Sequence, residues 1–329
     1  MPLSKIQGIE GQVTPNLGRR NLVINGDFQI NQRGNGNGVG DAGYIGVDRW
    51  RGYISTSSTI SFTKTAFAAG QSDVDKNLRH YLRFDWLGTG SATTKILNQR
   101  IEGAEKGNGQ NVTLSFWGRT EQADDCTLRL IQNFGSGGSS QTNTDSGTID
   151  LTTSWQYFTH TFALPSTSGK TVGTNHFLEL QFIFGPATLN SYFDITGVQL
   201  EYGDTATDFE HRSEGEELQL CQRYYQRTQG SSSGYQNLCV LVNYSTGTDQ
   251  RGVIPFTTEM RVGPAVSKNG NLMILGPGGN FSNLNAGDGL TTHMAGIRVN
   301  TSSNMSTGQA TLLRGNNDGT AHIQFDAEL

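Results

Sequence analysis

The sequence predicts an all-β protein, and three observations support that prediction. The 329 residues include 43 Gly, while hydrophobic residues make up 34 % and charged residues only 16 %, both below the usual share for a globular protein. The chain still carries 16 Phe, 10 Tyr and 4 Trp, which a disordered chain would lack. Short segments of alternating apolar and polar residues recur, separated by Gly, Asn and Ser clusters, as strands and turns require. A helical bundle and a doubly wound nucleotide-binding enzyme are therefore disfavoured.

Five segments of the first two thirds of the chain show the clearest strand pattern: 112–119, 126–131, 155–164, 177–184 and 193–200. Each places its apolar residues on one face. In 177–184, for example, the Leu and Phe side chains alternate with Glu179 and Gln181. One dry and one wet face per strand is what a two-sheet sandwich requires. Long loops are expected between strands at 33–46, 135–147 and 166–175.

The chain divides into four predicted parts. Residues 1–20 have no periodicity and are expected to form an extended N-terminal arm. The arm cannot bury Ile6, Ile9 and Val13 itself, so they are expected to contact another chain, and a floppy terminus is the alternative. Residues 21–212 are expected to form a jelly-roll β-sandwich, 213–228 a short linking helix, and 229–329 a smaller β-sandwich. Six strand-like segments occur in the last part: 238–244, 251–260, 271–276, 296–300, 311–315 and 321–329.

The predicted helix begins with a capping box, because Ser213 is followed three residues later by Glu216. Its apolar residues form a broad surface, which includes Leu218, Cys221, Tyr224 and Tyr225. This surface could pack on its own domain, or meet copies of itself on the axis of an oligomer. Leu218, Cys221, Tyr224 and Tyr225 are therefore the predicted oligomer interface.

The charge pattern excludes two classes of partner. The net charge is −5, and 7 acidic but only 3 basic residues of the chain lie in 201–228. No basic stripe follows a nucleic-acid backbone, and no apolar run approaches the ~18 residues of a membrane span. We expect neither a nucleic-acid partner nor membrane insertion. The N-terminus lacks the apolar block of a secretory signal.

No catalytic motif survives inspection of its context. The segment 230–234 (GSSSG) matches a nucleophile elbow formally, but it follows a predicted helix and precedes a strand, the reverse of the order an elbow needs. The six His lack metal-ligand spacing. Cys126, Cys221 and Cys239 are expected to be buried free thiols, made in a reducing compartment. We predict that the protein is not an enzyme.

A binding function remains. Sugar-binding sites combine aromatic platforms with amides, carboxylates and arginine, because sugars present both apolar faces and hydroxyl groups. The candidate ligand-binding residues are Tyr44, Trp50, Tyr53, Trp117, Arg119 and Trp155. The alternative for each is a place in the core or in a subunit interface. A structural Ca²⁺ bound by Asp27 and Asp194 is the one cofactor expected, if any.

Several segments carry a family resemblance. NLVINGDFQINQRG (21–34), followed by a Gly-rich loop and VDRW (47–50), resembles the opening of tail-fibre and receptor-binding proteins of tailed bacteriophages. VTLSFWGR (112–119) and FDITGVQLEYGDTATDFEHR (193–212) look like strands of a galactose-binding-like jelly roll of the carbohydrate-binding-module type. EGEELQLCQRYYQR (214–227) is similar to the helix that follows this jelly roll. PFTTEMRVGPAV (255–266) and the closing IQFDAEL look like a fibre-tip β-sandwich.

The resemblance implies a homotrimer in the virion, assembled in the host cytoplasm. Its arm would hold other tail or baseplate proteins, and the trimer would attach to a glycan on the host surface, with the loops 33–46, 276–292 and 301–308 as contact regions. The first alternative is a connector or decoration protein of the virion without a ligand site. A glycan-cleaving enzyme, which would need paired carboxylates in a groove, is the second.

Overall fold

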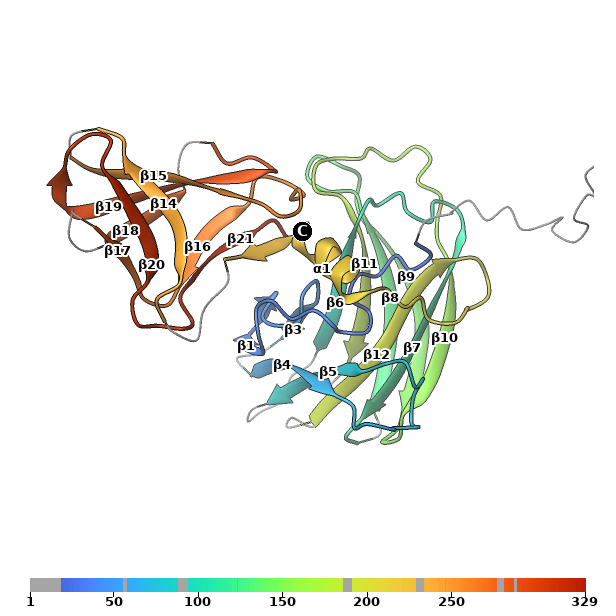
Figure 1. The fold of residues 1–329 in the computed structure, drawn as a ribbon. Helices are drawn as coiled ribbons and strands as arrows, with labels where there is room; N and C mark the ends of the chain where they lie inside the picture. The colour runs from blue at the N-terminus through green and yellow to red at the C-terminus, as the bar shows by residue number, and fades with distance from the viewer. Residues whose placement is uncertain are drawn as a thin grey trace, which may run out of the picture.

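The computed structural model describes residues 19–55, 58–87, 94–122, 124–185, 191–228, 234–245, 247–276, 281–286 and 289–329. Ile6, Ile9 and Val13 lie outside these ranges, so their predicted contacts stay a prediction. The all-β prediction is confirmed, because the described residues form two β-sandwich domains and a single short helix. The two domains lie side by side, with the helix and the end of the chain between them (Figure 1). No helix in the described ranges has the length and apolarity to cross a membrane.

The first domain is a sandwich of two six-stranded antiparallel sheets, named here after their long inner strands. The β12 sheet has the order β1-β4-β5-β12-β7-β10, and its strands are Gly36–Val39, Thr59–Ala66, His80–Leu87, Ser191–Tyr202, Asn111–Thr120 and Gln156–Ala163. The β11 sheet has the order β2-β3-β6-β11-β8-β9, and its strands are Asp41–Gly43, Arg51–Ile54, Lys95–Glu102, Phe177–Phe184, Asp124–Asn133 and Thr142–Leu151. The loops expected at 33–46 and 135–147 are thus partly strand.

The core of the first domain lies between these sheets, where the predicted dry faces meet. Phe182 of β11 contacts the rings of Phe116 and Phe193, at centroid distances of 5.0 and 5.7 Å, across the sandwich. Burying such a ring stabilises a fold by about 3–5 kcal/mol relative to alanine. The predicted wet face of β11 is different, because Glu179 and Gln181 are only 5 % and 8 % exposed. Both belong to a network in which the Glu179 carboxylate accepts hydrogen bonds from Gln181, Asn98 and Arg100.

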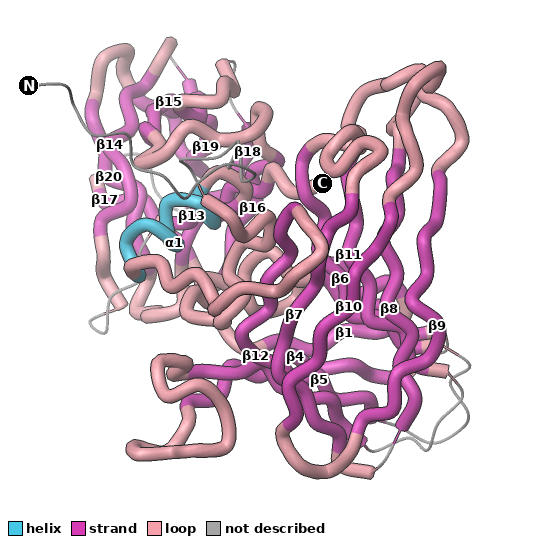
Figure 2. The backbone as a smooth tube through the Cα atoms, turned by 90° about the vertical axis from the view of Figure 1, so that its right-hand side faces the viewer, coloured by secondary structure: helices cyan, strands magenta, loops and turns pink. Residues whose placement is uncertain are grey.

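The single helix, α1 (Glu214–Gln222), is shorter than predicted. Ser213 caps its N-terminus as expected, and the Ser213 hydroxyl accepts a hydrogen bond from the Glu216 N–H at 3.3 Å. The helix ends at the cap residue Arg223, and β13 (Tyr225–Arg227) follows at once (Figure 2). The helical prediction for 225–228 is wrong because these residues pair with the far end of the chain, and tertiary pairing overrides local propensity.

The second domain packs a three-stranded sheet on a six-stranded one. The three-stranded sheet has the order β13-β21-β16, with β21 at His322–Asp326 and β16 at Ala265–Asn269. The six-stranded β14 sheet has the order β17-β20-β14-β15-β19-β18, and its strands are Leu272–Leu275, Ala310–Gly315, Asn237–Asn243, Gly247–Pro255, Met294–Met305 and Phe281–Ala286. The strands β16 and β18 were not expected from the sequence. Small and branched side chains such as Leu241, Ile297 and Ile323 fill the core between these sheets.

The two domains meet at a junction formed by Arg33, Asp48, Arg49, Tyr224, Tyr225, Asp326 and Glu328. Arg33 pairs with Asp48 at 3.3 Å in its own domain, and with Asp326 and Glu328 at 3.1 and 3.4 Å beyond it. Arg49 forms an ion pair with Glu328. The Arg33 guanidinium also lies 3.7 Å from the ring centroid of Tyr225.

This junction corrects the predicted oligomer interface. Cys221, Tyr224 and Tyr225 are almost fully buried within one chain, so they are not available on an open symmetry axis. Leu218 alone of the four is partly exposed. Cys126 and Cys221 are buried free thiols as predicted, whereas Cys239 is half-buried. Burial raises the pKa of Cys239 to about 12.

Candidate functional site

The structure separates the six predicted ligand-binding residues into three places. Trp50 lies in the core, Tyr44 and Tyr53 lie on the side of the β11 sheet, and the outer face of the β12 sheet carries Trp117, Arg119 and Trp155. The prediction for Trp50 is wrong. Its ring is fully buried against Phe28 and Phe182, and its Nε1–H donates to the carbonyl oxygen of Asn25 at 3.1 Å.

Tyr44 belongs to the junction between the domains. Its hydroxyl donates to the carbonyl oxygen of Leu329 at 3.3 Å. Burial raises the pKa of Tyr44, although the charges of Arg49 and Arg100 oppose the shift. Tyr53, by contrast, is exposed on β3 at the other face of the sandwich. Neither residue lies near Trp117 in the strand order, because β3 and β7 belong to different sheets.

The pair of Trp117 and Tyr157 forms an aromatic surface on the β12 sheet. The two residues are directly opposite each other on β7 and β10. Their ring centroids are 5.3 Å apart with an interplanar angle of 47°. Tyr157 is 46 % exposed, although exposing a large aromatic ring to water is unfavourable.

A groove of about 380 Å³ lies over this aromatic pair, within the size range of small-molecule sites. Its lining residues come from β7, β10, the bulge of β12 and two loops: Asp75, Ser115, Trp117, Tyr157, Gly197, Ala206, Thr207, Asp208 and Phe209. Gly197 sits in the bulge of β12 with a φ of 62°. A Cβ there would lie 3.0 Å from Leu78 and 3.5 Å from Trp117, so glycine keeps this end of the groove open.

The loop 203–212 forms one wall of the groove, and two buried side chains of β12 hold it. Glu201 accepts hydrogen bonds from the N–H and the hydroxyl of Thr207, both at 2.8 Å. Gln199 accepts from the N–H of Glu210 at 2.8 Å and donates to the carbonyl oxygen of Asp208 at 3.3 Å. These bonds fix the backbone on both sides of Phe209, and its ring therefore has a defined place in the wall.

The two carboxylates of the groove differ in what they already bind. The Asp208 carboxylate has no hydrogen-bond or ion-pair partner within the described residues. Asp75 accepts one hydrogen bond from the N–H of Asn77 at 2.9 Å, and its second oxygen lies 4.0 Å from Nε2 of His211. The groove thus combines three aromatic rings with two carboxylates.

Arg119 and Trp155 lie beside the groove but hold the sheet together. Arg119 and Arg83 both donate to the Asp194 carboxylate, with N–O distances of 2.8 to 3.0 Å. The indole of Trp155 packs on Arg119 and on the ring of Tyr81, at 4.9 and 5.5 Å. Since its faces are occupied in this way, Trp155 supports the groove from one side and does not offer a platform.

Asp27 and Asp194, the expected calcium ligands, both have other partners. Asp194 is fully buried and its two oxygens are bound by guanidinium groups. The hydrogen bond to the Asp194 carboxylate in turn raises the pKa of Arg83. Asp27 accepts a hydrogen bond from Gln29 instead. Burial raises the pKa of Asp27, so its charged form is disfavoured. Within the described ranges no three His, Cys, Asp or Glu side chains are placed to hold a metal ion.

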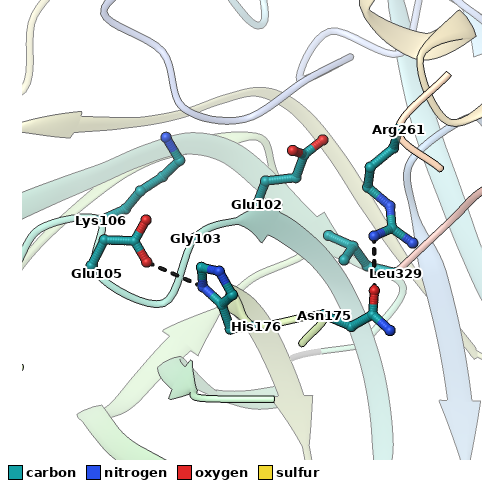
Figure 3. Close-up of a pocket in the computed structure, with 8 residues that line it drawn as sticks. All are labelled: Glu102, Gly103, Glu105, Lys106, Asn175, His176, Arg261 and Leu329. Atoms are coloured by element: carbon teal, nitrogen blue, oxygen red, sulfur yellow. Dashed lines mark hydrogen bonds and ion pairs between the residues drawn. The ribbon is translucent and has the colours of Figure 1, made fainter. Parts of the chain in front are cut away.

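A second pocket, of about 330 Å³, lies between the two domains (Figure 3). No Phe, Tyr or Trp side chain lines it, and most of its charged groups already have partners. Arg261 donates to Asn175 at 3.0 Å and His176 lies 3.1 Å from Glu105, as Figure 3 shows. Glu102 is bound by both nitrogens of Arg223 at 2.8 and 3.0 Å. The contacts of Arg261 and Arg223 join the first domain to the part of the chain that follows it, whereas His176 and Glu105 pair within the first domain. The groove over Trp117 is therefore the better candidate site.

Sequence reasoning missed Asp75, Tyr157, Asp208 and Phe209. Tyr157 follows the period-two pattern with Trp155, so the same strand signal that selected Trp155 could have found it. The loop residues carried no such signal, because bonds between distant side chains and backbone decide where they lie.

No family model matches the chain, and no curated protein matches it. Solved structures of low similarity match part of it. The family 11 carbohydrate-binding module of Clostridium thermocellum, solved with a β-1,3-1,4-mixed-linked tetrasaccharide, is 12 % identical with a TM-score of 0.32 over 53 % of this chain and 99 % of the module. A family 61 module solved with β-1,4-galactotriose is 12 % identical with a TM-score of 0.33, over 56 % of this chain and all of the module.

The enzymatically active domain of tailspike protein 4 from bacteriophage CBA120 is 15 % identical, with a TM-score of 0.36 over 56 % of this chain and 22 % of that domain's chain. At these TM-scores the similarities carry no argument about the ligand, activity or assembly of this protein.

Proposed function

We propose that this protein binds a carbohydrate in the groove over Trp117 and Tyr157. The observation that carries the proposal is the exposed aromatic pair at the base of a groove whose wall holds Phe209. Aromatic rings bind the apolar faces of sugar rings, while hydroxyl groups need hydrogen-bond partners. The Asp208 carboxylate lines the same space and supplies such a partner.

The proposed biological role is attachment of a tailed bacteriophage to a host glycan, as part of a virion fibre or tail. It is supported by the resemblance of 21–34 and 47–50 to phage fibre proteins, by the resemblance of 193–212 to a jelly roll of the carbohydrate-binding-module type, and by a groove suited to sugars. In the proposed homotrimer, each groove would bind weakly, and three copies would raise the overall avidity without new contacts. The N-terminal arm would hold the other virion proteins.

The proposed trimer needs a surface other than the stripe on α1, which is used inside the chain. The outer face of the β14 sheet offers one. Val240 and Val253 are 57 % and 55 % exposed there, and Val242 and Leu275 are also exposed. Contiguous apolar residues on a sheet face are typical of interfaces between protein molecules. We assign this face to contact with a second copy of the chain.

The test of the groove is glycan binding by the full chain and two variants. An array of defined oligosaccharides identifies the tightest binder, and calorimetric titration with that oligosaccharide measures affinity. Trp117→Ala and Tyr157→Ala should each weaken binding by about tenfold or more, since truncating a central aromatic contact costs above 1.4 kcal/mol. Tyr53→Ala, an equal change on the other sheet, is the matched control and should bind as the parent does.

Other outcomes would overturn the proposal. Binding that Trp117→Ala leaves intact and Tyr53→Ala abolishes would move the site to the β11 sheet. No binding to any oligosaccharide or to whole bacterial cells would favour a connector or decoration protein. Release of reducing ends from a bound glycan would identify an enzyme, with Asp75 and Asp208 as the carboxylates to replace first.

A further inference from the structure

The groove carries negative charge and no positive charge. Two of its nine lining residues, Asp75 and Asp208, are carboxylates, and none is Lys, Arg or His. A groove suited to any neutral sugar needs no such imbalance. Two fixed negative charges in a half-enclosed space disfavour an anionic ligand, because each charge repels it and water screens the repulsion less than at an open surface.

The cationic side chains around the groove do not cancel these charges. Arg119 is bound by the Asp194 carboxylate. The Arg20 guanidinium donates to the carbonyl oxygen of Asp208, at 3.0 Å, and leaves the carboxylate of that residue without a partner. His211 approaches Asp75 only to 4.0 Å. Asp208 is therefore the group in the groove whose charge is least compensated.

The aromatic rings strengthen the preference for a cation. Trp117, Tyr157 and Phe209 all line the groove, and the face of an aromatic ring attracts a positive charge placed on it. Aromatic faces bind ammonium groups in proteins, and a carboxylate beside them adds a charge with which the ammonium group can pair. An uncharged hydroxyl can donate a hydrogen bond to the carboxylates, but the aromatic rings attract it much less than they attract a cation.

We propose that the ligand carries a positively charged nitrogen, which binds between Asp208 and the aromatic rings. Two sources share this chemistry: a glycan built of amino sugars with free amines, and a surface polymer that carries choline. The inference rests on the proposed function, and it excludes glycans rich in uronic or sialic acids, which the two carboxylates would repel.

The experiment is calorimetric titration of the full chain at pH 6 with four probes. These are a β-1,4-linked glucosamine tetramer, its fully N-acetylated counterpart, a galacturonic acid trimer and choline chloride. The glucosamine tetramer should bind about tenfold more tightly than the acetylated one, equivalent to 1.4 kcal/mol, and added salt should weaken only the former. Choline should compete with it, and the acid trimer should not bind.

Two variants test whether the Asp208 carboxylate causes the preference for the free amine. Asp208→Asn should remove the preference for the free amine while weak binding of the acetylated tetramer persists. Glu121→Gln, which removes a charge outside the groove lining, is the control and should keep the preference. Binding of choline without the glucosamine tetramer would support the cation and assign it to a choline-bearing polymer.

Three results would overturn the inference. Equal affinity for the free and acetylated tetramers, both lost in Trp117→Ala, would leave the sugar site standing without a preference for charge. Tightest binding of the acid trimer would contradict the charge argument directly. Amine binding that Trp117→Ala and Asp208→Asn both leave unchanged would place the cation outside the groove.

Discussion

The guanidinium carbon of Arg49 lies 3.4 Å from the ring centroid of Tyr224. The first domain therefore packs directly against the segment that leads into the second domain. Arg49 is fully buried and also pairs with Glu328 near the end of the chain. A single side chain therefore contacts Tyr224, which follows α1 and its cap residue, and Glu328, which follows β21. The cation–π contact and the ion pair both gain strength from their removal from water.

Replacing Arg49 by alanine should destabilise the protein by about 3–5 kcal/mol, because Glu328 would be left as a buried carboxylate without this partner. Chemical denaturation followed by tyrosine and tryptophan fluorescence measures the effect. Arg51→Ala removes an ion pair with the exposed Asp41 at 2.7 Å, and should cost only about 0–1 kcal/mol. Equal losses for the two variants would contradict the role of the junction.

Tyr225 and Leu218 of the predicted helix differ in burial, and mutation can separate their roles. Tyr225→Asp should unfold or strongly destabilise the chain, since it puts a carboxylate into the buried contact with Arg33. Leu218→Asp should leave the melting temperature nearly unchanged, because Leu218 is partly exposed. Light scattering of the folded Leu218→Asp variant reports the mass of the oligomer. A monomer would restore α1 as the interface between copies.

Mutation of the exposed valines of the second domain should, unlike Leu218→Asp, change the mass of the oligomer. Val240→Glu combined with Val253→Glu should lower the mass of the oligomer toward that of one chain, because charge would meet charge where the β14 sheets face each other. Val39→Glu is the control, since Val39 on β1 is 58 % exposed and equally apolar. Sedimentation equilibrium distinguishes the species. An unchanged mass of the oligomer in the double variant would show that this face is not the interface between copies.

Stability should fall in acid partly through Glu102. Burial alone would raise the pKa of Glu102, but hydrogen bonds from Arg223 and Tyr224 outweigh it, and the pKa is lowered from 4.5. A carboxyl whose folded pKa is lowered stabilises the fold above pH 4.5, and that contribution disappears as the pH falls through the folded pKa. Since both partners are about one third exposed, the contribution is about 0.2–1 kcal/mol.

Melting temperatures between pH 6 and pH 3 measure this effect. Glu102→Gln should lower stability at pH 6 and flatten the acid dependence, and Arg223→Gln should produce the same flattening from the other partner. If both variants keep the full acid dependence of the parent, the pair between Glu102 and Arg223 does not supply it.

The sequence predicted the architecture better than the exposure of individual residues. Period-two alternation identified the dry faces of β7, β8 and β11, since buried apolar residues must share one side of a strand. The pattern could not reveal that Glu179 and Gln181, on the outer side, are buried in a polar network. That outcome depends on which neighbours, such as Arg100 and Asn98, cover the sheet.

The site was only half predictable for the same reason. Trp117 was found because it alternates with Phe116 on β7, whereas Trp50 was assigned to the surface although it lies just before β3 and turns into the core. Asp208 and Phe209 reach the groove through the bonds of their loop to Gln199 and Glu201. Those bonds join residues whose proximity no local pattern encodes.

The pairing of β13 with β21 has a mechanical consequence. Tyr225 and Asp326 are in register on these antiparallel strands, so the polypeptide passes into and out of the second domain at neighbouring points. A tensile force on that domain is therefore shared by two connections to the first domain. One is the chain itself, through β13 and α1, and the other is the ion pair of Glu328 with Arg49. A domain on a single flexible linker would only stretch its linker under such a pull. Here the same force acts on the contacts of Arg33 and Arg49 with the second domain.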